Sequence, residues 1–259
     1  MRFIKTYQKT LIFFIIIGLF GGFFTGLYLL DSYPDEIAKQ LEEQVIASGL
    51  GNIPTNILLG AITAIQSALY GLVLGAIGIW LGKKTGLWKD ERDIRACPLF
   101  ITLLLSVICG LAMILPDILF FGKYSEAIME SYLTKPTIPY ILATISYGAV
   151  IEEVMLRLFM MSLIAFILFK LFGKNHSEPT VAILAMANII SSLLFALGHL
   201  PATFAMLGSS PIIIFRCILM NGSLGLVFGW LYRKYGLRYA MIAHGGCHIV
   251  SKLIWLLFI

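Results

Sequence analysis

The chain has 259 residues, of which 59% are hydrophobic and only 13% are charged, and its mean hydropathy is +0.91. A soluble domain needs a larger polar surface than this composition provides, so the sequence predicts an integral membrane protein. The net charge of +5 is attributed to loops beside anionic lipid headgroups, and nothing in the sequence indicates a nucleic-acid partner.

Apolar stretches long enough to cross a membrane recur along the whole chain. A helix needs roughly 20 apolar residues to cross a hydrocarbon core of about 30 Å, and the stretches are continuous rather than alternating, which favours helices over a barrel. The fold class is therefore predicted to be all-α, a polytopic transmembrane bundle of seven helices, or eight if the long fourth stretch divides. The predicted spans are 10–30, 57–81, 99–121, 138–172, 181–200, 212–232 and 239–259.

Residues 1–259 are interpreted as one integral membrane domain with a short amphipathic stretch at 36–46. The apolar core of the first span is too long for a typical signal peptide and no small-residue cleavage site follows it, so a retained helix is predicted. The cysteines have no CxxC spacing and are expected to be free thiols. They are Cys97, Cys109, Cys217 and Cys247.

Basic residues gather in the loops that share a side with the N-terminus, whereas the other loops are acidic or mixed. Cytoplasmic loops carry an excess of Lys and Arg, so the N-terminus is predicted to be cytoplasmic and the C-terminus outside. In a bacterial cell this membrane would be the plasma membrane. The basic residues are Lys83, Lys84, Lys89, Arg92, Arg95, Lys170, Lys174, Arg233, Lys234 and Arg238.

Three charges interrupt the fourth apolar stretch, in the sequence AVIEEVMLRL at 149–158. Ionisable side chains within a membrane helix normally face the bundle interior, where they are paired or wet. Glu153 and Arg157 are four residues apart, in the favourable order for an ion pair on one helix face. Glu152 is displaced by about 100°, so it is predicted to face a cavity and to be available as a base.

Three of the four histidines lie in predicted membrane helices. His199 ends the fifth span in FALGHL, and His244 and His248 are four residues apart in AHGGCHIV, the spacing by which a helix presents two imidazoles to one water or one metal ion. His176 lies in a polar loop and is expected to be solvated.

Other polar residues in the second half are interpreted as structural. Arg216 is expected to extend toward the outer membrane interface, and Asn188 and Asn221 are expected to bridge helices.

Taken in order, EExxxR at 152–157, FxxxH at 195–199 and HxxxH at 244–248 resemble the three motifs of the CAAX-prenyl protease and bacteriocin-processing family of intramembrane proteases, also called the Abi family. The resemblance covers roughly residues 140–251, and a catalytic core is assigned to 137–258. Two features depart from the family pattern. The Phe and Gly of the common EExxFRG motif are absent, and His248 stands where Asn or Asp is common.

The resemblance implies an intramembrane endopeptidase in which Glu152 and His199 activate a water. It also implies that His244 and the residue at 248 stabilise the oxyanion, with Glu153 and Arg157 in support. Both metalloprotease and metal-independent glutamate mechanisms have been described for the family. Because Glu152, His199, His244 and His248 have the chemistry of a zinc shell, a zinc-assisted and a metal-free mechanism both stay open.

The expected partners are membrane lipids and a peptide or protein substrate. A prenylated C-terminal tail, a leader peptide and a membrane-protein loop are all compatible with the sequence, which does not indicate an oligomeric state. Two other functions are weighed against the protease. One is a non-catalytic immunity or interaction protein of the same fold, and the other is a proton-coupled transporter, which is disfavoured because the buried polar residues lie only in the second half.

Hydropathy places His199 and His244 at different depths, separated by about 20 Å at 1.5 Å per residue. For the site to assemble, residues 200–208 are predicted to form a re-entrant segment, or the stretch 138–172 to break or tilt. The prediction is a polar, water-filled cavity with His199 and His244 within about 12 Å of each other.

Overall fold

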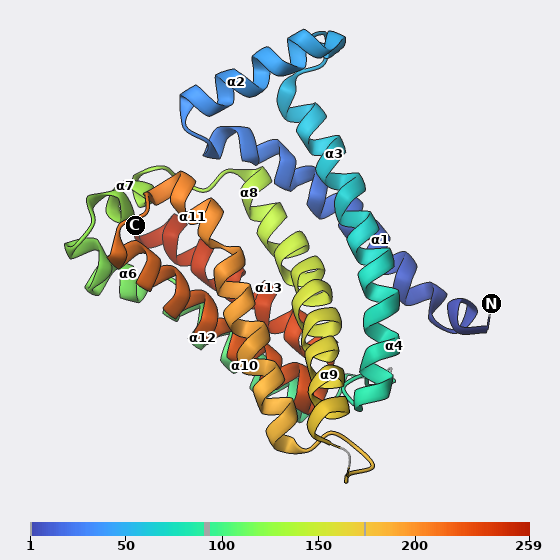
Figure 1. Cartoon of the computed structure of the whole chain (residues 1–259). Coiled ribbons are helices and arrows are strands. Elements are labelled where there is room, and N and C mark those ends of the chain that lie inside the picture. Colours follow the sequence, from blue (N-terminus) through green and yellow to red (C-terminus); the bar gives the residue numbers. More distant parts are fainter. Residues whose placement is uncertain (1, 91–93, 174) are drawn as a thin grey trace.

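The computed structural model describes all residues except 1, 91–93 and 174, and of residues 2–4 and 31 the backbone alone. Arg92 and Lys174, which contribute to the predicted orientation, therefore lie outside the described residues. Every regular element in the described part of the chain is helical, and seven helices are long and apolar enough to span a membrane. The predicted all-helical membrane bundle is confirmed (Figure 1).

The N-terminal half contains three of these spans. The first is α1 (Arg2–Ser32), and the second is a continuous helix made of α3 (Thr55–Leu69), η2 (Tyr70–Leu74) and α4 (Gly75–Thr85). Between them, α2 (Asp35–Val45) and η1 (Ile46–Leu50) project beyond the bundle, and neither has a buried residue. The third span begins with α5 (Ala96–Ala112) and ends in α6 (Leu115–Leu119) and η3 (Phe121–Lys123).

After α7 (Glu126–Leu133), the fourth span is one continuous helix of 35 residues, so the alternative of eight spans is not needed. It consists of α8 (Ile138–Ala143), η4 (Thr144–Glu152), η5 (Val154–Met161) and α9 (Ser162–Phe172). The last spans are α10 (Val181–Gly198) with α11 (Leu200–Leu207), then α12 (Pro211–Tyr235) and α13 (Leu237–Phe258).

The predicted re-entrant segment after His199 is wrong. Residues 200–207 form the helix α11, and α10 and α11 together make a single candidate span, Val181–Leu207. Pro201 lies in the first turn of α11, where its missing N–H has no intrahelical partner to lose. His199 therefore lies inside a crossing rather than at its end.

The segments with basic residues meet at one end of the bundle. Tyr7 near the N-terminus accepts a hydrogen bond at 2.7 Å from Lys83, at the end of the second span. The Arg95 backbone N–H donates to Tyr239 at the start of α13 at 2.8 Å. The N-terminus, the loop after the second span and the connection between α12 and α13 thus share one side, as the charge pattern indicated. That this side is cytoplasmic stays a prediction.

The packing places α13 at the centre, against α5, α12 and η4, while α10 packs on α12 and η5. Close approach of α13 to its neighbours uses two glycines. A Cβ on Gly245 would lie 3.1 Å from Ala149 in η4, and one on Gly246 would lie 2.5 Å from Ser106 in α5. The histidine helix is thereby held against the glutamate helix.

Candidate active site

The glutamates lie in a stretch of π-helix, which comprises η4 and η5 and is joined at Glu153. π-Helical turns are rare and occur frequently at functional sites. Both carboxylates approach the same imidazole of α13, that of His244. The predicted division, with only Glu152 facing the histidines, is therefore incomplete, because Glu153 contacts His244 as well.

Glu153 connects His244 to Arg157, and all three side chains are buried. Glu153 Oε1 lies 2.9 Å from His244 Nδ1, and Glu153 Oε2 lies 3.5 Å from Arg157 Nε. The predicted Glu153–Arg157 ion pair is thus present. Since an ionised carboxylate can only accept a hydrogen bond, His244 carries a proton on Nδ1 and turns Nε2 toward Glu152.

The Arg157 guanidinium makes no hydrogen bond to the described residues. Its charge is met instead by Glu153 and by two aromatic faces, with the guanidinium carbon 4.7 Å from the Phe195 ring centroid and 5.8 Å from that of Phe228. Cation–π contacts of this kind are strongest where water is excluded. The arginine therefore stabilises the buried Glu153 carboxylate and packs against Phe195 and Phe228.

On the other side of the ring, His244 Nε2 lies 3.9 Å from Glu152 Oε2. This separation is too long for a direct hydrogen bond but is short enough for a water to contact both groups. The His244 ring is stacked between Phe228, at 4.6 Å, and His248, at 5.1 Å, so its orientation is fixed from both faces.

Gly148 leaves a space in front of the two α13 histidines. A Cβ at this position would lie 3.4 Å from His248 Nε2 and 3.8 Å from His244 Nε2. Gly148 is one turn before Glu152 on the same helix. The Nε2 atoms of both histidines thus face the backbone that carries the Glu152 carboxylate.

His199 lies at the junction of α10 and α11, with Nδ1 2.8 Å from the Phe195 carbonyl oxygen. A carbonyl only accepts, so His199 Nδ1 carries the proton and Nε2 is left as an acceptor. The Phe195 ring is edge-on to both His199, at 4.5 Å, and His244, at 6.0 Å. Because both imidazoles contact one ring, their centres lie within the predicted separation of about 12 Å.

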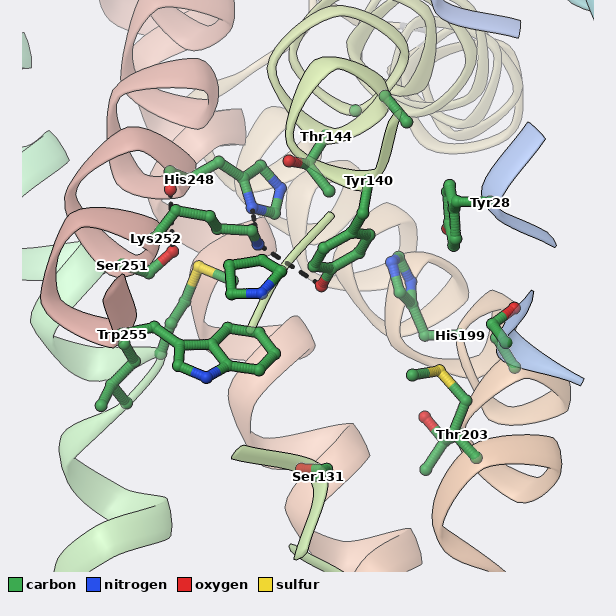
Figure 2. Close-up of a pocket in the computed structure, with 18 of the residues that line it drawn as sticks. Tyr28, Ser131, Tyr140, Thr144, His199, Thr203, His248, Ser251, Lys252 and Trp255 are labelled. Atoms are coloured by element: carbon green, nitrogen blue, oxygen red, sulfur yellow. Dashed lines mark hydrogen bonds between the residues drawn. The ribbon is translucent and has the colours of Figure 1, made fainter. Parts of the chain in front are cut away.

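A cavity of about 480 Å³ brings these groups to a common space. Glu152, His199 and His248 line it, and Figure 2 shows His199 across the cavity from His248, with Tyr140 between them in this view. A cavity is thus present beside three of the predicted site residues, whereas His244 is buried and does not line it. Its walls also carry Tyr28, Tyr140, Arg216, Lys252 and Trp255.

The residues predicted as possible zinc ligands do not form a ready metal site among the described residues. Among the described residues no group of three or more His, Cys, Asp or Glu side chains is placed to hold a metal ion. The rings of His244 and His248 stack on each other, and His248 Nδ1 faces the Lys252 ammonium at 3.4 Å.

Two buried ionisable residues were missed by the sequence analysis, Asp117 and Lys252. Each lies within a predicted span, and that signal alone could have revealed both. Asp117 also corrects the prediction for Arg216, which does not extend to the interface. Arg216 Nε donates to Asp117 Oδ1 at 2.5 Å, its Nη2 pairs with Asp117 Oδ2, and Tyr132 donates to Oδ2 at 2.8 Å.

This second cluster joins α6, α7 and α12 at one wall of the cavity. Burial and the neighbouring Asp117 carboxylate raise the pKa of Tyr132, so its hydroxyl remains a donor at neutral pH. The asparagines behave differently from each other. Asn188 bridges α10 to α12 through the Leu226 carbonyl at 3.0 Å, as predicted, whereas Asn221 bonds within its own helix to Cys217.

The four cysteines are free, as expected.

Fold and site together define a polytopic helical membrane protein in which a carboxylate–imidazole cluster faces a cavity between the spans. Residues 134–250 match the family model of type II CAAX prenyl endopeptidase Rce1-like proteins, a family of proteases. The resemblance to the CAAX-prenyl protease and bacteriocin-processing family is thereby confirmed over this part of the chain, which includes every candidate site residue. No curated protein and no solved structure matches the chain.

Proposed function

We propose that the protein is an intramembrane endopeptidase that hydrolyses a peptide bond with a water activated by Glu152 and His199. The observation that carries the proposal is the arrangement around Gly148. The Nε2 atoms of His244 and His248 both face this position, and it lies beside a cavity lined by Glu152, His199 and His248. A base beside donors for a developing negative charge is the arrangement that peptide hydrolysis needs.

In the proposed reaction, His199 Nε2 accepts a hydrogen bond from the water and Glu152 accepts its proton. The resulting hydroxide attacks the carbonyl carbon of the scissile bond, and the carbonyl oxygen becomes an oxyanion. His248 and His244 donate to this oxyanion through Nε2–H. When the C–N bond breaks, the proton held by Glu152 passes to the leaving amine, so the products are a carboxylic acid and an amine.

For His244 to donate through Nε2, its ring must carry protons on both nitrogens. In that form each N–H is directed toward a carboxylate, with Glu153 2.9 Å from Nδ1 and Glu152 3.9 Å from Nε2. Glu153 and Arg157 therefore support the reaction by orienting His244.

The substrate is proposed to be a peptide or protein, and a lipidated one is favoured by the family description of a prenyl endopeptidase. The cavity combines polar groups with apolar walls that include Met113, Ile114 and Leu224, which suits a peptide next to a hydrocarbon chain. Leader peptides and membrane-protein loops are the alternatives for the assay to separate.

The test is cleavage of a panel of prenylated, leader and loop peptides by the purified protein in lipid nanodiscs. Glu152→Gln keeps the shape of the side chain but removes the base, and kcat should fall by about 10³-fold or more. Glu130→Gln, on the exposed face of α7, is the matched control and should cleave like the wild type.

Equal turnover by wild type and Glu152→Gln would overturn the proposed base. Each reaction is repeated after dialysis against a chelator, and loss that zinc restores would establish the zinc-assisted mechanism. A wild-type protein that cleaves no member of the panel, while binding one of them, would favour the non-catalytic interaction protein.

A further inference from the structure

Lys252 is a buried cation beside the candidate site, and it has no role in the proposed reaction. Its side chain belongs to α13, it is 5% exposed, and it lines the cavity. The ammonium nitrogen lies 3.4 Å from His248 Nδ1, 3.4 Å from the Tyr140 hydroxyl and 4.5 Å from the Tyr140 ring centroid (Figure 2). No described carboxylate lies within 4.0 Å of it to form an ion pair. Burying a cation without an anionic partner is costly.

The contact with His248 has a defined direction. An ammonium group has three donors and no acceptor, so His248 Nδ1 must accept the hydrogen bond. A neutral imidazole that accepts at Nδ1 carries its proton on Nε2. His248 Nε2 is the atom that lies 3.4 Å from the Cβ position of Gly148, facing the same space as His244 Nε2. The lysine therefore leaves His248 with an N–H directed at the site.

We propose that Lys252 is a positioning residue that holds His248 as a neutral N–H donor to the oxyanion. This inference rests on the proposed function. An asparagine amide always offers N–H donors, whereas an imidazole does so only in the right tautomer. The ammonium selects that tautomer, and its charge polarises the ring so that Nε2–H becomes a stronger donor.

The spacing on α13 explains how one helix supplies the whole arrangement. His244, His248 and Lys252 follow one another at intervals of four residues, so they lie along one face of the helix. The His244 and His248 rings stack at 5.1 Å, and the lysine contacts the outer edge of the second ring. Lys252 thus acts on His248, which lies one turn earlier on the same helix.

The proposal is tested with Lys252→Met in two backgrounds, one with His248 and one with His248→Asn. Removing a donor from an oxyanion site lowers kcat by about 10²-fold to 10³-fold, and weakening one should lower it by about tenfold. In the His248 background, Lys252→Met should therefore reduce kcat about tenfold with little change in KM. In the Asn background the same change should alter kcat by less than about twofold.

Two further variants complete this design. Lys252→Arg retains a cationic donor and should recover most of the lost kcat, whereas Lys39→Met, a change at an exposed lysine of α2 outside the cavity, should leave kcat as in the wild type. An equal loss in both backgrounds would overturn the proposal, because the lysine would then act independently of His248. An increase in KM restricted to peptides with a free C-terminal carboxylate would also overturn it and would assign Lys252 to substrate binding.

A measurement without substrate separates this inference from the proposed function. The chain has four histidines, so ¹⁵N labelling of histidine gives few NMR signals, and His248→Asn identifies those of His248. We expect a non-protonated, hydrogen-bonded Nδ1 and a protonated Nε2 in the natural protein, and loss of the Nδ1 hydrogen bond in Lys252→Met. A proton on Nδ1 of His248 in the natural protein would overturn the proposal even if the peptidase assay succeeds.

Discussion

The N-terminal pair of spans and the C-terminal half of the bundle associate in different ways. Helix α1 packs against α3 through small residues, and a Cβ on Gly18 would lie 2.7 Å from the Ser67 carbonyl oxygen. Thr63 donates across the same interface to the Gly22 carbonyl at 2.7 Å. The helices η4, η5, α12 and α13 enclose charged groups instead, with Glu153, Arg157 and His244 in mutual contact.

The difference follows from what each interface has to do. In lipid, apolar side chains gain little by leaving one hydrocarbon environment for another, so close packing of small residues is an effective way to join two helices. Burying charged groups costs desolvation free energy and does not improve the packing of the helices. Charged groups are therefore expected where they take part in a reaction. The first interface is thus predicted to affect stability, and the second to affect activity.

Gly148→Ala should separate activity from stability most strongly, because it alters activity without harming the fold. The added methyl lies at ordinary contact distances, 3.4 Å from His248 Nε2 and 3.8 Å from His244 Nε2, and alanine favours a helix by about 1 kcal/mol over glycine. It fills the space that both Nε2 atoms face. We expect kcat to fall by about 10²-fold while the free energy of unfolding stays equal or rises.

The control is Gly222→Ala on α12, where the new methyl would meet only the Ala196 side chain at 3.9 Å. Peptide cleavage and unfolding in mixed SDS micelles are measured for both variants. Loss of stability in Gly148→Ala would show that this glycine serves packing, and the contrast between the two regions would fail.

Asp117→Asn should show that not every buried charge of the bundle serves the reaction. The change removes the carboxylate that pairs with Arg216, at a position that is fully buried. Breaking a buried ion pair in this way costs about 3 kcal/mol. Unfolding in SDS measures the loss. The double variant Asp117→Leu with Arg216→Met should recover part of it, since an apolar pair carries no desolvation cost. A double variant less stable than Asp117→Asn would contradict this account.

Gly18→Ala should lower stability by about 2 kcal/mol, because the methyl would collide with the backbone of α3 and separate the helices. The kcat of the protein that remains folded should change by less than roughly twofold. Both quantities are measured beside those of Gly222→Ala. A larger loss of kcat than of stability would place the α1–α3 interface within the catalytic machinery.

The smallest effect is expected at Asp90, in the loop between the second span and α5. A hydrogen bond from the Trp88 indole, aided by Lys83, lowers the pKa of Asp90. A carboxyl whose pKa is lower in the folded state stabilises the fold above its unfolded pKa, and this contribution is lost as the pH falls through the folded value. For so exposed a group it is below about 0.5 kcal/mol.

Unfolding of wild type and Asp90→Asn at pH 7 and at about pH 3 checks this prediction. The two proteins should differ slightly at the higher pH and converge at the lower one. A difference that persists at low pH would assign the effect to something other than the ionised carboxylate.

Much of the architecture was accessible from the order of residues alone. Long apolar stretches predict spans because unpaired backbone groups are not tolerated in lipid, which leaves helices as the solution for such stretches. The charges of Glu152, Glu153 and Arg157 predict an interior site for a related reason, since an ion facing lipid is costly. Asp117 and Lys252 carry the same signal, because each is an ionisable residue within a predicted span.

What the sequence by itself determined is the set of helices and the ionisable groups that the bundle must enclose, because both follow from the free energy of placing single residues in hydrocarbon. Which of those groups meet was decided only by the tertiary structure. The contacts of Glu153 and Glu152 with opposite sides of His244, and of Lys252 with His248, depend on π-helical winding, helix depth and ring orientation. These are set by packing between segments distant in the chain, and no local pattern encodes them.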